Sequence, residues 1–327
     1  MVLDLISRFT SANRVSIMLY HGFCKGSTRD PRFPKLLPIQ QFEEHLKIFA
    51  RYGRPCSIEQ LAAGADRGVA VTFDDGYANN YELAFPILKK YRFPATIFVT
   101  TGFLDRTAPL WGDWLEFLVT TTTRTDTTFH WKGNIIPLKF RQAGPAAVIA
   151  ELKALLRATP SPGVSDFLHA LQQHLRLSYD WTVMPEQLRP LRWEDVRAMR
   201  QSGLISFGAH TVSHPVLSRC SPAEQTSEII TSKQRLEEEL GESCLLFAYP
   251  YGQPGDYTEL TTQIVRRAGY TFALSARSGN NQPPLWNPYD LRRWGADLSA
   301  DELSFLVSGG PNVIGALKRV YGRCEPE

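Results

Sequence analysis

Short segments rich in β-branched and aromatic residues alternate with amphipathic stretches along most of this chain. The short segments have the composition of buried strands. Between them apolar residues recur at helical spacing, as at Phe42, Leu46 and Phe49. This alternation predicts parallel strands with helices outside, in a closed or distorted barrel or a doubly wound sheet. The strand-like segments are residues 15–20, 69–73, 95–100, 204–209, 245–249 and 271–275.

The alternation stops between residues 108 and 187, which we interpret as an insertion and a candidate substrate cap within a barrel of residues 13–107 and 188–300. A threonine-rich tract is followed by a hairpin-like sequence that turns at residues 132–134 and by two helical stretches. Residues 301–327 are predicted to form a helical tail. The tryptophans of the insertion either line a sugar-binding face or fill its own core. They are Trp111, Trp114, Trp131 and Trp181.

Composition limits the class of protein. With 327 residues and 43% hydrophobic content, the chain is long enough for one α/β barrel with insertions. A formal charge of +3, without long runs of one sign, predicts no nucleic-acid partner. The five cysteines are widely spaced and form no CxxC pair, which predicts buried thiols rather than disulfides or a thiolate zinc site.

The hydropathy of the chain predicts no transmembrane segment, since no stretch approaches 18 consecutive apolar residues. Residues 1–14 lack the continuous apolar centre of a secretory signal, so the expected location is the cytoplasm. Apolar residues at positions 2–9 predict a short amphipathic helix that either packs on the barrel or contacts a membrane surface. The sequence indicates no oligomeric state.

Polar residues directly follow four of the predicted strands. They occur at residues 20–22 (YHG), 74–76 (DDG), 210–214 (HTVSH) and 249–252 (YPYG). The carboxyl ends of parallel strands form the rim at which α/β barrels assemble their active sites. We therefore expect these four segments to meet in one site.

Asp74 and Asp75 are adjacent like charges next to a buried strand, an arrangement that requires a compensating cation. His210 and His214 follow another strand and lie four residues apart. Two neutral imidazoles and one carboxylate are typical ligands of a catalytic divalent transition metal. The second aspartate would then accept a proton from water.

These motifs resemble those of a known family. TFDDG at residues 72–76, HTVSH at 210–214 and YPYG at 249–252 are similar, in order and separation, to the first three motifs of the polysaccharide deacetylase, or NodB-homology, family. The resemblance covers about residues 13–107 and 188–300. It implies a distorted (β/α) barrel and metal-dependent hydrolysis of an acetyl group, usually from an N-acetylhexosamine.

The resemblance also implies roles for individual residues. Asp74 resembles the catalytic base, and Asp75, His210 and His214 resemble the metal ligands. Zinc is the expected ion, and cobalt, nickel or iron would satisfy the same ligands. The backbone N–H of Tyr251 is expected to face the developing oxyanion.

One departure from the family pattern concerns an arginine. Many members carry an arginine that tethers the base at the position of Ala248. The YPYG form is similar to a FAYP-type branch that takes its arginine from a later strand. Two candidates, Arg292 and Arg293, lie in the sequence LRRWGAD, and Arg293 aligns with the arginine of that branch. A pair of surface arginines is the alternative.

A second departure concerns the general acid. Most members end with a late histidine that protonates the leaving amine, whereas the last histidine here is His214. His21 resembles a histidine of the poly-N-acetylglucosamine deacetylase branch that takes this role, and histidine is suited to protonating an amine near neutral pH. The alternatives are a histidine hydrogen-bonded at a strand end and an acid that has been lost.

The sequence therefore predicts a metal-dependent hydrolase that removes an acetyl group from an N-acetylated sugar. The expected substrate is a polysaccharide or its precursor, in exopolysaccharide biosynthesis in the cytoplasm or at a membrane surface. Two alternatives stay open: an O-acetyl esterase that uses the same metal centre on a glycan, and a catalytically inactive carbohydrate-binding barrel.

Overall fold

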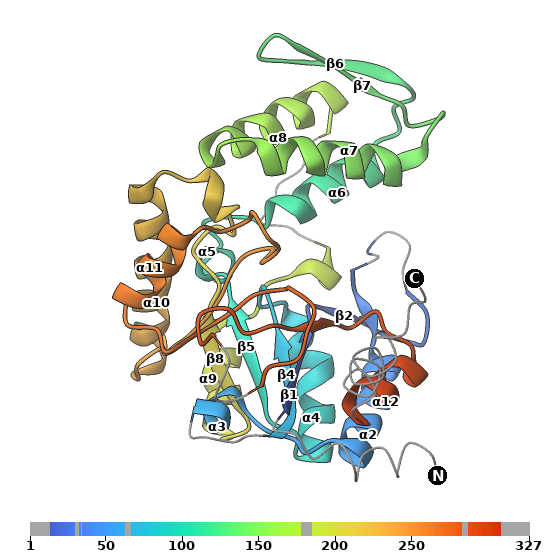
Figure 1. The fold of residues 1–327 in the computed structure, drawn as a ribbon. Helices are drawn as coiled ribbons and strands as arrows, with labels where there is room; N and C mark the ends of the chain where they lie inside the picture. Colours follow the sequence, from blue (N-terminus) through green and yellow to red (C-terminus); the bar gives the residue numbers. More distant parts are fainter. Residues whose placement is uncertain are drawn as a thin grey trace, which may run out of the picture.

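The structure is a computed structural model that describes residues 14–29, 33, 35–62, 67–177, 185–282 and 287–308. The described residues form, at the centre of the structure, a sheet of seven parallel strands in the order β10-β9-β8-β5-β4-β1-β11 (Figure 1). The strands are β1 (Arg14–Tyr20), β4 (Arg67–Phe73), β5 (Ala95–Val99), β8 (Ile205–Ala209), β9 (Leu246–Ala248), β10 (Phe272–Leu274) and β11 (Trp294–Gly295).

The sheet curls into a distorted barrel. From β1 to β10 each strand of the sheet is added on the same side of the strand before it in the chain. In a doubly wound sheet, by contrast, the direction in which strands are added reverses partway along the chain. β11 pairs with β1, and just before it Leu291 bridges to Leu274 of β10. One segment thus contacts both edges of the sheet. The predicted distorted barrel is confirmed, and the doubly wound sheet is wrong.

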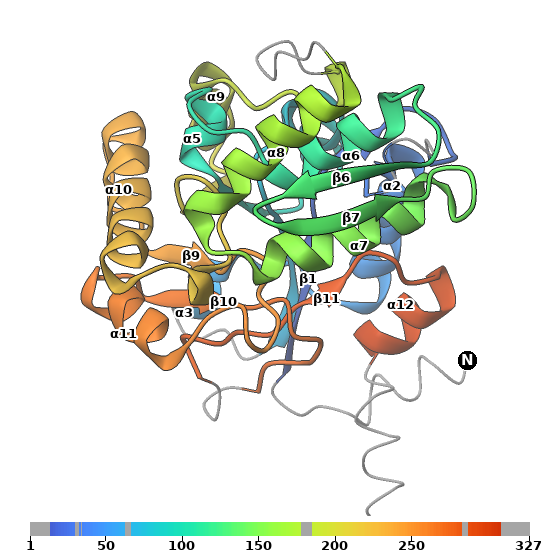
Figure 2. The same cartoon turned by 90° about the horizontal axis from the view of Figure 1, so that it is seen from above.

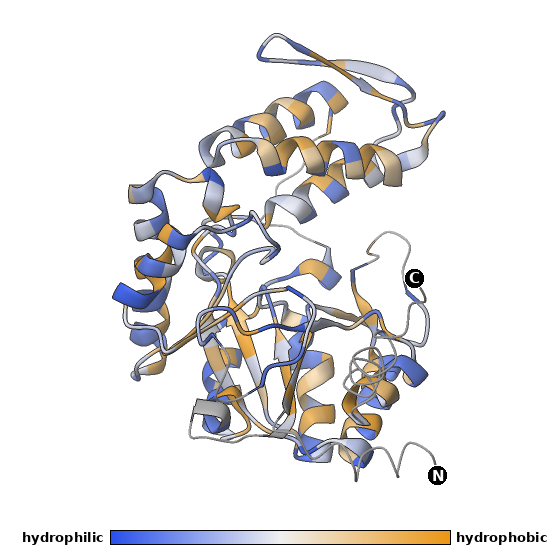
Figure 3. Ribbon diagram, viewed as in Figure 1, coloured by the Kyte–Doolittle hydropathy of each residue, from blue (hydrophilic) through white to orange (hydrophobic). Residues whose placement is uncertain are grey.

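Helices cover the outside of the sheet. Phe42, Leu46 and Phe49 are buried on one face of α2, as their spacing predicted. Hydrophobic residues are concentrated along the strands and on the inward faces of these helices (Figure 3). The helices of the barrel are α2 (Ile39–Tyr52), α3 (Ile58–Ala62), α4 (Phe85–Tyr91), α5 (Thr101–Leu104), α9 (Trp193–Gln201), α10 (Pro222–Leu240), α11 (Glu259–Arg267) and α12 (Ala300–Ser308).

Short elements join these helices and strands. A π-helical turn, η1, directly precedes α4. The 3-10 turn η3 lies shortly before α9, and a second 3-10 turn, η4, follows β8. A two-stranded ribbon of β2 and β3 lies between β1 and α2. The bounds are η1 (Asn80–Ala84), η3 (Glu186–Leu188), η4 (Leu217–Arg219), β2 (Phe23–Cys24) and β3 (Leu37–Pro38).

The described residues of the predicted insertion form a layer over one end of the barrel (Figures 1 and 2). Its hydrophobic core is separate from that of the barrel and contains Trp114 and Leu152, with Trp131 packed against it. The predicted hairpin and both helical stretches are confirmed, whereas Trp181 lies outside the described residues. The elements are α6 (Trp111–Thr121), β6 (Thr127–Trp131), β7 (Asn134–Leu138), α7 (Gly144–Ala158) and α8 (Ser161–Leu175).

Other predictions fall partly outside the described residues. The four described cysteines are free and buried, as predicted, and Cys324 is not described. The predicted helix at positions 2–9 and residues 309–327 of the predicted tail also lie outside. Across the described part of the chain, every helix is too short or too polar to cross a bilayer. The division of the chain at residues 108 and 187 stays a prediction.

Candidate metal centre and its cavity

β4 brings two adjacent aspartates to the carboxyl end of the sheet. Directly after the strand the backbone turns sharply, with φ of 75° at Asp75 and 91° at Gly76. Aspartate tolerates this left-handed conformation better than most residues, and glycine adopts it freely. The N–H of Thr100 donates to the carbonyl of Asp75 at 3.2 Å and fixes the turn against the end of β5. Asp74 and Asp75 then line the same cavity.

The two histidines come from the loop after β8. The N–H of His210 donates to the carbonyl of Val99 at 2.9 Å, which holds the start of the loop against β5. Positive φ angles at Thr211 (66°) and His214 (57°) turn the loop back, so that the two imidazole centroids lie 4.8 Å apart. Such an angle at a β-branched residue is rare and costs about 1–3 kcal/mol.

Glu228 of α10 holds this loop in place. Its carboxylate accepts hydrogen bonds from the N–H groups of Val212 (2.8 Å) and Ser213 (2.9 Å) and from the Ser213 hydroxyl (2.6 Å). The Thr211 hydroxyl accepts from the N–H of His214 at 3.1 Å. These contacts indicate that Thr211 and Ser213 stabilise the loop, and Glu228 is a contributor that the sequence did not reveal.

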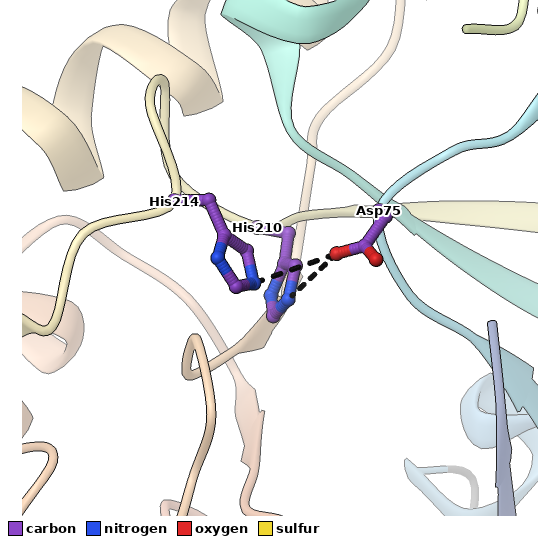
Figure 4. Close-up of side chains that lie close together, drawn as sticks. All are labelled: Asp75, His210 and His214. Carbon is purple, nitrogen blue, oxygen red and sulfur yellow. Dashed lines mark ion pairs between the residues drawn. The ribbon is translucent and has the colours of Figure 1, made fainter. Parts of the chain in front are cut away.

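Asp75, His210 and His214 converge (Figure 4). Nε2 of His210 lies 3.8 Å and Nε2 of His214 lies 3.4 Å from Oδ1 of Asp75. One ligand atom from each residue lies within 4.8 Å of the other two. Oδ1 of Asp75 is buried and has no hydrogen-bond partner among the described residues. A buried carboxylate oxygen without a partner is costly unless a cation compensates it.

The protonation of both imidazoles suits a metal. Nδ1–H of His210 donates to the carbonyl of Ala248 at 2.8 Å. Because a carbonyl only accepts, Nδ1 carries a proton, and Nε2 is the ring nitrogen that faces Asp75. Burial lowers the pKa of His214 to about 3, against the opposing effect of Asp75, so this imidazole is neutral at pH 7. The three side chains fit a divalent transition metal.

Arg293, just before β11, pairs with Asp74. Its Nη1 and Nη2 each donate to one carboxylate oxygen at 2.7 Å, and its Nε donates to the carbonyl of Ser275 at 2.8 Å. Burial would raise the pKa of Asp74, but Arg293 and the nearby histidines lower it, and the net shift is downward. Asp74 is therefore ionised at neutral pH. The other candidate, Arg292, is exposed.

Loss of the Arg293 charge is expected to destabilise the fold. We predict that Arg293→Gln lowers the free energy of unfolding by about 3–5 kcal/mol, because the Asp74 carboxylate stays buried without its cation. Arg292→Gln removes the same charge from the neighbouring exposed residue and should change stability by less than about 0.5 kcal/mol. Urea unfolding of both variants without metal measures the difference, and equal losses would contradict the assigned pairing.

The candidate metal residues line a cavity of about 380 Å³ between the barrel and the insertion. α6 and α7 supply one wall, and the carboxyl ends of β1, β4 and β8 supply the other. Of the three described tryptophans of the insertion, Trp111 lines this cavity, whereas Trp114 and Trp131 pack within the insertion. Other residues of the lining are His21, Lys35, Asp113, Glu116, Lys153, Arg157 and Tyr251.

His21 lies directly after β1. Its backbone carbonyl accepts a hydrogen bond from Nδ2 of Asn80 at 2.7 Å, which fixes this end of the strand. Its ring has no hydrogen-bond partner among the described residues, unlike an ordinary structural histidine at a strand end. Burial lowers the pKa of His21, and the charges of Asp75 and Asp74 oppose that shift.

Tyr251 presents its backbone in an unusual conformation. Its φ is 61°, and that of the following Gly252 is 62°, a left-handed conformation that glycine adopts freely. Within the described part of the chain, the Tyr251 N–H donates no hydrogen bond. Its ring lies beside that of His214, with centroids 4.8 Å apart, and beside Trp111, at 5.8 Å.

The sequence did not identify the charged residues of the insertion as cavity residues, although their spacing was a usable signal. Asp113 and Glu116 lie three residues apart on α6, and Lys153 and Arg157 lie four apart on α7. Each pair therefore occupies one helix face. An exposed helix face commonly carries such pairs, so only the position of the insertion over the barrel identifies them as cavity residues.

Comparison with known proteins identifies the family. The family model described as polysaccharide deacetylase matches residues 62–273. This chain belongs to the polysaccharide deacetylase family. It is 23% identical over 274 residues to YxkH of Bacillus subtilis (strain 168), a protein named after these deacetylases. The match covers 81% of this chain and 66% of YxkH, just under two thirds of that relative's length.

Solved structures of other proteins show the same fold. Streptococcus pyogenes deacetylase PplD, in complex with acetate, has a TM-score of 0.58 and 21% identity, over 90% of this chain and 97% of that chain. A de-N-acetylase from Aggregatibacter actinomycetemcomitans has a TM-score of 0.56 and 15% identity, over 88% of this chain and 97% of that chain. IcaB from Ammonifex degensii has a TM-score of 0.55 and 20% identity, over 91% of this chain and 97% of that chain. The predicted family is confirmed, and its FAYP-type branch stays a prediction.

Proposed function

We propose that this polysaccharide deacetylase hydrolyses the acetyl amide of an N-acetylated sugar with the help of a divalent metal. The observation that carries the proposal is the convergence of Asp75, His210 and His214 beside a buried, arginine-paired Asp74 in one cavity. These three residues would hold the metal, with zinc the expected ion. When bound, the metal supplies Lewis acidity that polarises a carbonyl and lowers the pKa of water.

Asp74 is the proposed general base. Its Oδ2 lies 3.8 Å from Nε2 of His210, so the carboxylate is beside the candidate metal cluster of Asp75, His210 and His214. The two hydrogen bonds from Arg293 fix its orientation and keep it ionised. Asp74 can therefore accept the proton of the attacking water. A positioned base of this kind typically contributes about 10²–10⁴-fold in rate.

The Tyr251 N–H is the proposed donor to the oxyanion that develops as water attacks the acetyl carbonyl. It is left without an acceptor while its side chain contacts the ring of His214. Its positive φ is maintained by the fold before any substrate binds. A donor organised in advance in this way is worth about 10²–10³-fold in rate.

His21 is the proposed donor of the proton that the leaving amine requires. We expect His21→Gln to lower kcat for release of acetate from an N-acetylated sugar by about 10²-fold. Hydrolysis of 4-nitrophenyl acetate should change far less, because nitrophenolate leaves without a proton. Both rates are measured on protein with equal metal content, and an equal loss on the two substrates would remove the acid role from His21.

Product analysis tests the proposed function. Zinc-loaded protein is incubated with N-acetylglucosamine oligomers, and acetate and new primary amine are quantified together. We expect both in equal amounts, loss of both with a chelator, and recovery with added zinc. Acetate released only from O-acetylated glycans, with no amine, would make the protein an esterase. Bound metal without turnover on any acetylated sugar would make it a carbohydrate-binding barrel.

A further inference from the structure

Three cationic side chains line the cavity together with the candidate metal residues, and the mechanism proposed above uses none of them. They are Lys35, between β2 and β3, and Lys153 and Arg157 of α7. Lys153 and Arg157 are four residues apart, so α7 directs both from the same face. Charged side chains in a ligand cavity commonly determine which ligand binds there and how it is oriented.

Each of these cations pairs with a carboxylate that is more deeply buried than the cation. The side chain of Lys153 is 36% exposed and that of its partner Glu116 is 8% exposed. Arg157 is 39% exposed and its partner Asp256 is 9% exposed. Lys35 repeats the pattern, at 25% exposed against 3% for its partner Asp113. The cation is thus the more accessible member of each pair.

The cations also retain unused hydrogen-bond donors. Nη2 of Arg157 donates to both oxygens of Asp256, at 2.6 and 2.8 Å, and its Nη1 and Nε have no acceptor among the described residues. Lys153 contacts Glu116 alone of the described carboxylates, which leaves further donors on its ammonium group.

Burial lowers the pKa of Lys35 to about 8, so Lys35 is mostly charged at pH 7.

Apart from the candidate metal ligand Asp75, each described carboxylate of the lining is paired with a cation. Asp74 is neutralised by Arg293, and Asp75 faces the two candidate metal ligands. Asp113 and Glu116 are paired with lysines. With a divalent metal in place, the electrostatic field inside the cavity favours a negatively charged ligand.

The size of the cavity suits one sugar unit. Arg157 and His214 both contact the ring of Tyr251, with the Cζ of Arg157 4.8 Å from the ring centroid and the His214 ring centroid also at 4.8 Å. The guanidinium and a candidate metal ligand thus share one aromatic neighbour. A cavity of about 380 Å³ is also near the small end of the range for ligand pockets.

We propose that the cavity accepts an acetylated sugar unit that carries an anionic group, either a phosphate or a carboxylate. Lys35, Lys153 and Arg157 bind this group by charge-assisted hydrogen bonds, and the acetyl group lies at Asp75, His210 and His214. The inference rests on the proposed function, because it places the acetyl group at that site. It adds a substrate class that the family assignment does not provide.

Three sugars test this inference. N-acetylglucosamine 1-phosphate, N-acetylmuramic acid and N-acetylglucosamine carry a phosphate, a carboxylate and no charge, respectively. We expect kcat/KM for acetate release by the zinc-loaded full chain to be about 10–100-fold higher for at least one anionic sugar than for the neutral one. The better of the two anionic sugars distinguishes phosphate from carboxylate recognition.

Variants identify the residues that cause the preference. Arg157→Gln and Lys153→Gln should each lower the ratio of anionic to neutral kcat/KM by about 10-fold, mainly through KM for the anionic sugar. Arg157→Lys keeps the charge and should retain most of the preference. Lys132→Gln is the matched control, because Lys132 is 63% exposed at the hairpin turn and does not line the cavity. It should leave the ratio unchanged.

Calorimetric binding of the same sugars gives a readout that needs no turnover and separates the two proposals. Equal affinity for the charged and neutral sugars would overturn this inference, even if acetate is released. An unchanged ratio in both Arg157→Gln and Lys153→Gln would also overturn it. A binding preference for the anionic sugar, with no acetate released from any of the three, would support this inference and overturn the proposed function.

Discussion

Asp74→Asn is expected to lower kcat for acetate release by about 10²–10⁴-fold, the range typical of a lost general base. Asparagine keeps the size of the side chain, and its amide oxygen still accepts a hydrogen bond from Arg293, so the cavity should keep its shape. The amide cannot take a proton from water at neutral pH. Because Asp74 is not among the candidate ligands, zinc content should stay at the wild-type level.

Asp195→Asn is the matched control for this prediction. Asp195 is also a buried aspartate paired with an arginine, with Nε and Nη2 of Arg192 at 3.0 and 2.9 Å, but it lies outside the cavity. Its turnover should stay within about twofold of wild type, as for most substitutions away from a reacting site. Full turnover by Asp74→Asn with bound zinc would show that another group is the base.

Asp75→Asn is expected to have the other large effect, on metal binding. Asp75 supplies the only carboxylate of the candidate site in the described part of the chain. We expect zinc affinity to fall by more than about 100-fold, beyond the loss typical of a residue that only orients a ligand. Zinc at about 100 times its Kd should stabilise the wild type by about 2.7 kcal/mol, and the variant should lose this gain.

Without metal, the same substitution should change stability by less than the zinc-dependent loss. Burial of Asp75, whose Oδ1 has no hydrogen-bond partner in the described structure, opposes its charge, but the neighbouring histidines favour the charge and lower its pKa to about 2. Thermal unfolding with and without zinc measures both effects. A variant that is stabilised by zinc as strongly as the wild type would exclude Asp75 as a ligand.

The six sheet strands that the sequence predicted lie in strand-like segments of five or six residues. β1, β4 and β5 are buried on both faces, and such strands have continuous apolar sequences. β11 was missed because its two residues, Trp294 and Gly295, are too few to show any period. β11 is nevertheless important, because it pairs with β1 and follows the arginine that binds Asp74.

The candidate metal residues were predictable for a topological reason. TFDDG and HTVSH each follow a parallel strand, and the carboxyl ends of such strands meet at one rim. The choice between Arg292 and Arg293 needed more than pattern, because adjacent residues of an extended segment point to opposite sides. Periodicity implies only that one of the two faces inward; the family resemblance favoured Arg293, and the folded sheet places it against Asp74.

The charged wall of the cavity could not be predicted in this way. Lys153 and Arg157 have the spacing of an ordinary solvent-facing pair on α7. Their position in the cavity depends on how the insertion lies over the barrel, which is determined by contacts between residues distant in the sequence. Arg157, for example, binds Asp256, which is 99 residues further along the chain.

The central claim is that Asp75, His210 and His214 bind one divalent ion between them. Crystals grown with zinc, measured at the zinc absorption edge, test it directly. The account predicts one anomalous peak about 2.0–2.2 Å from a carboxylate oxygen of Asp75 and from Nε2 of both histidines. A crystal with no peak at these side chains, or with zinc bound elsewhere on the protein, would contradict it.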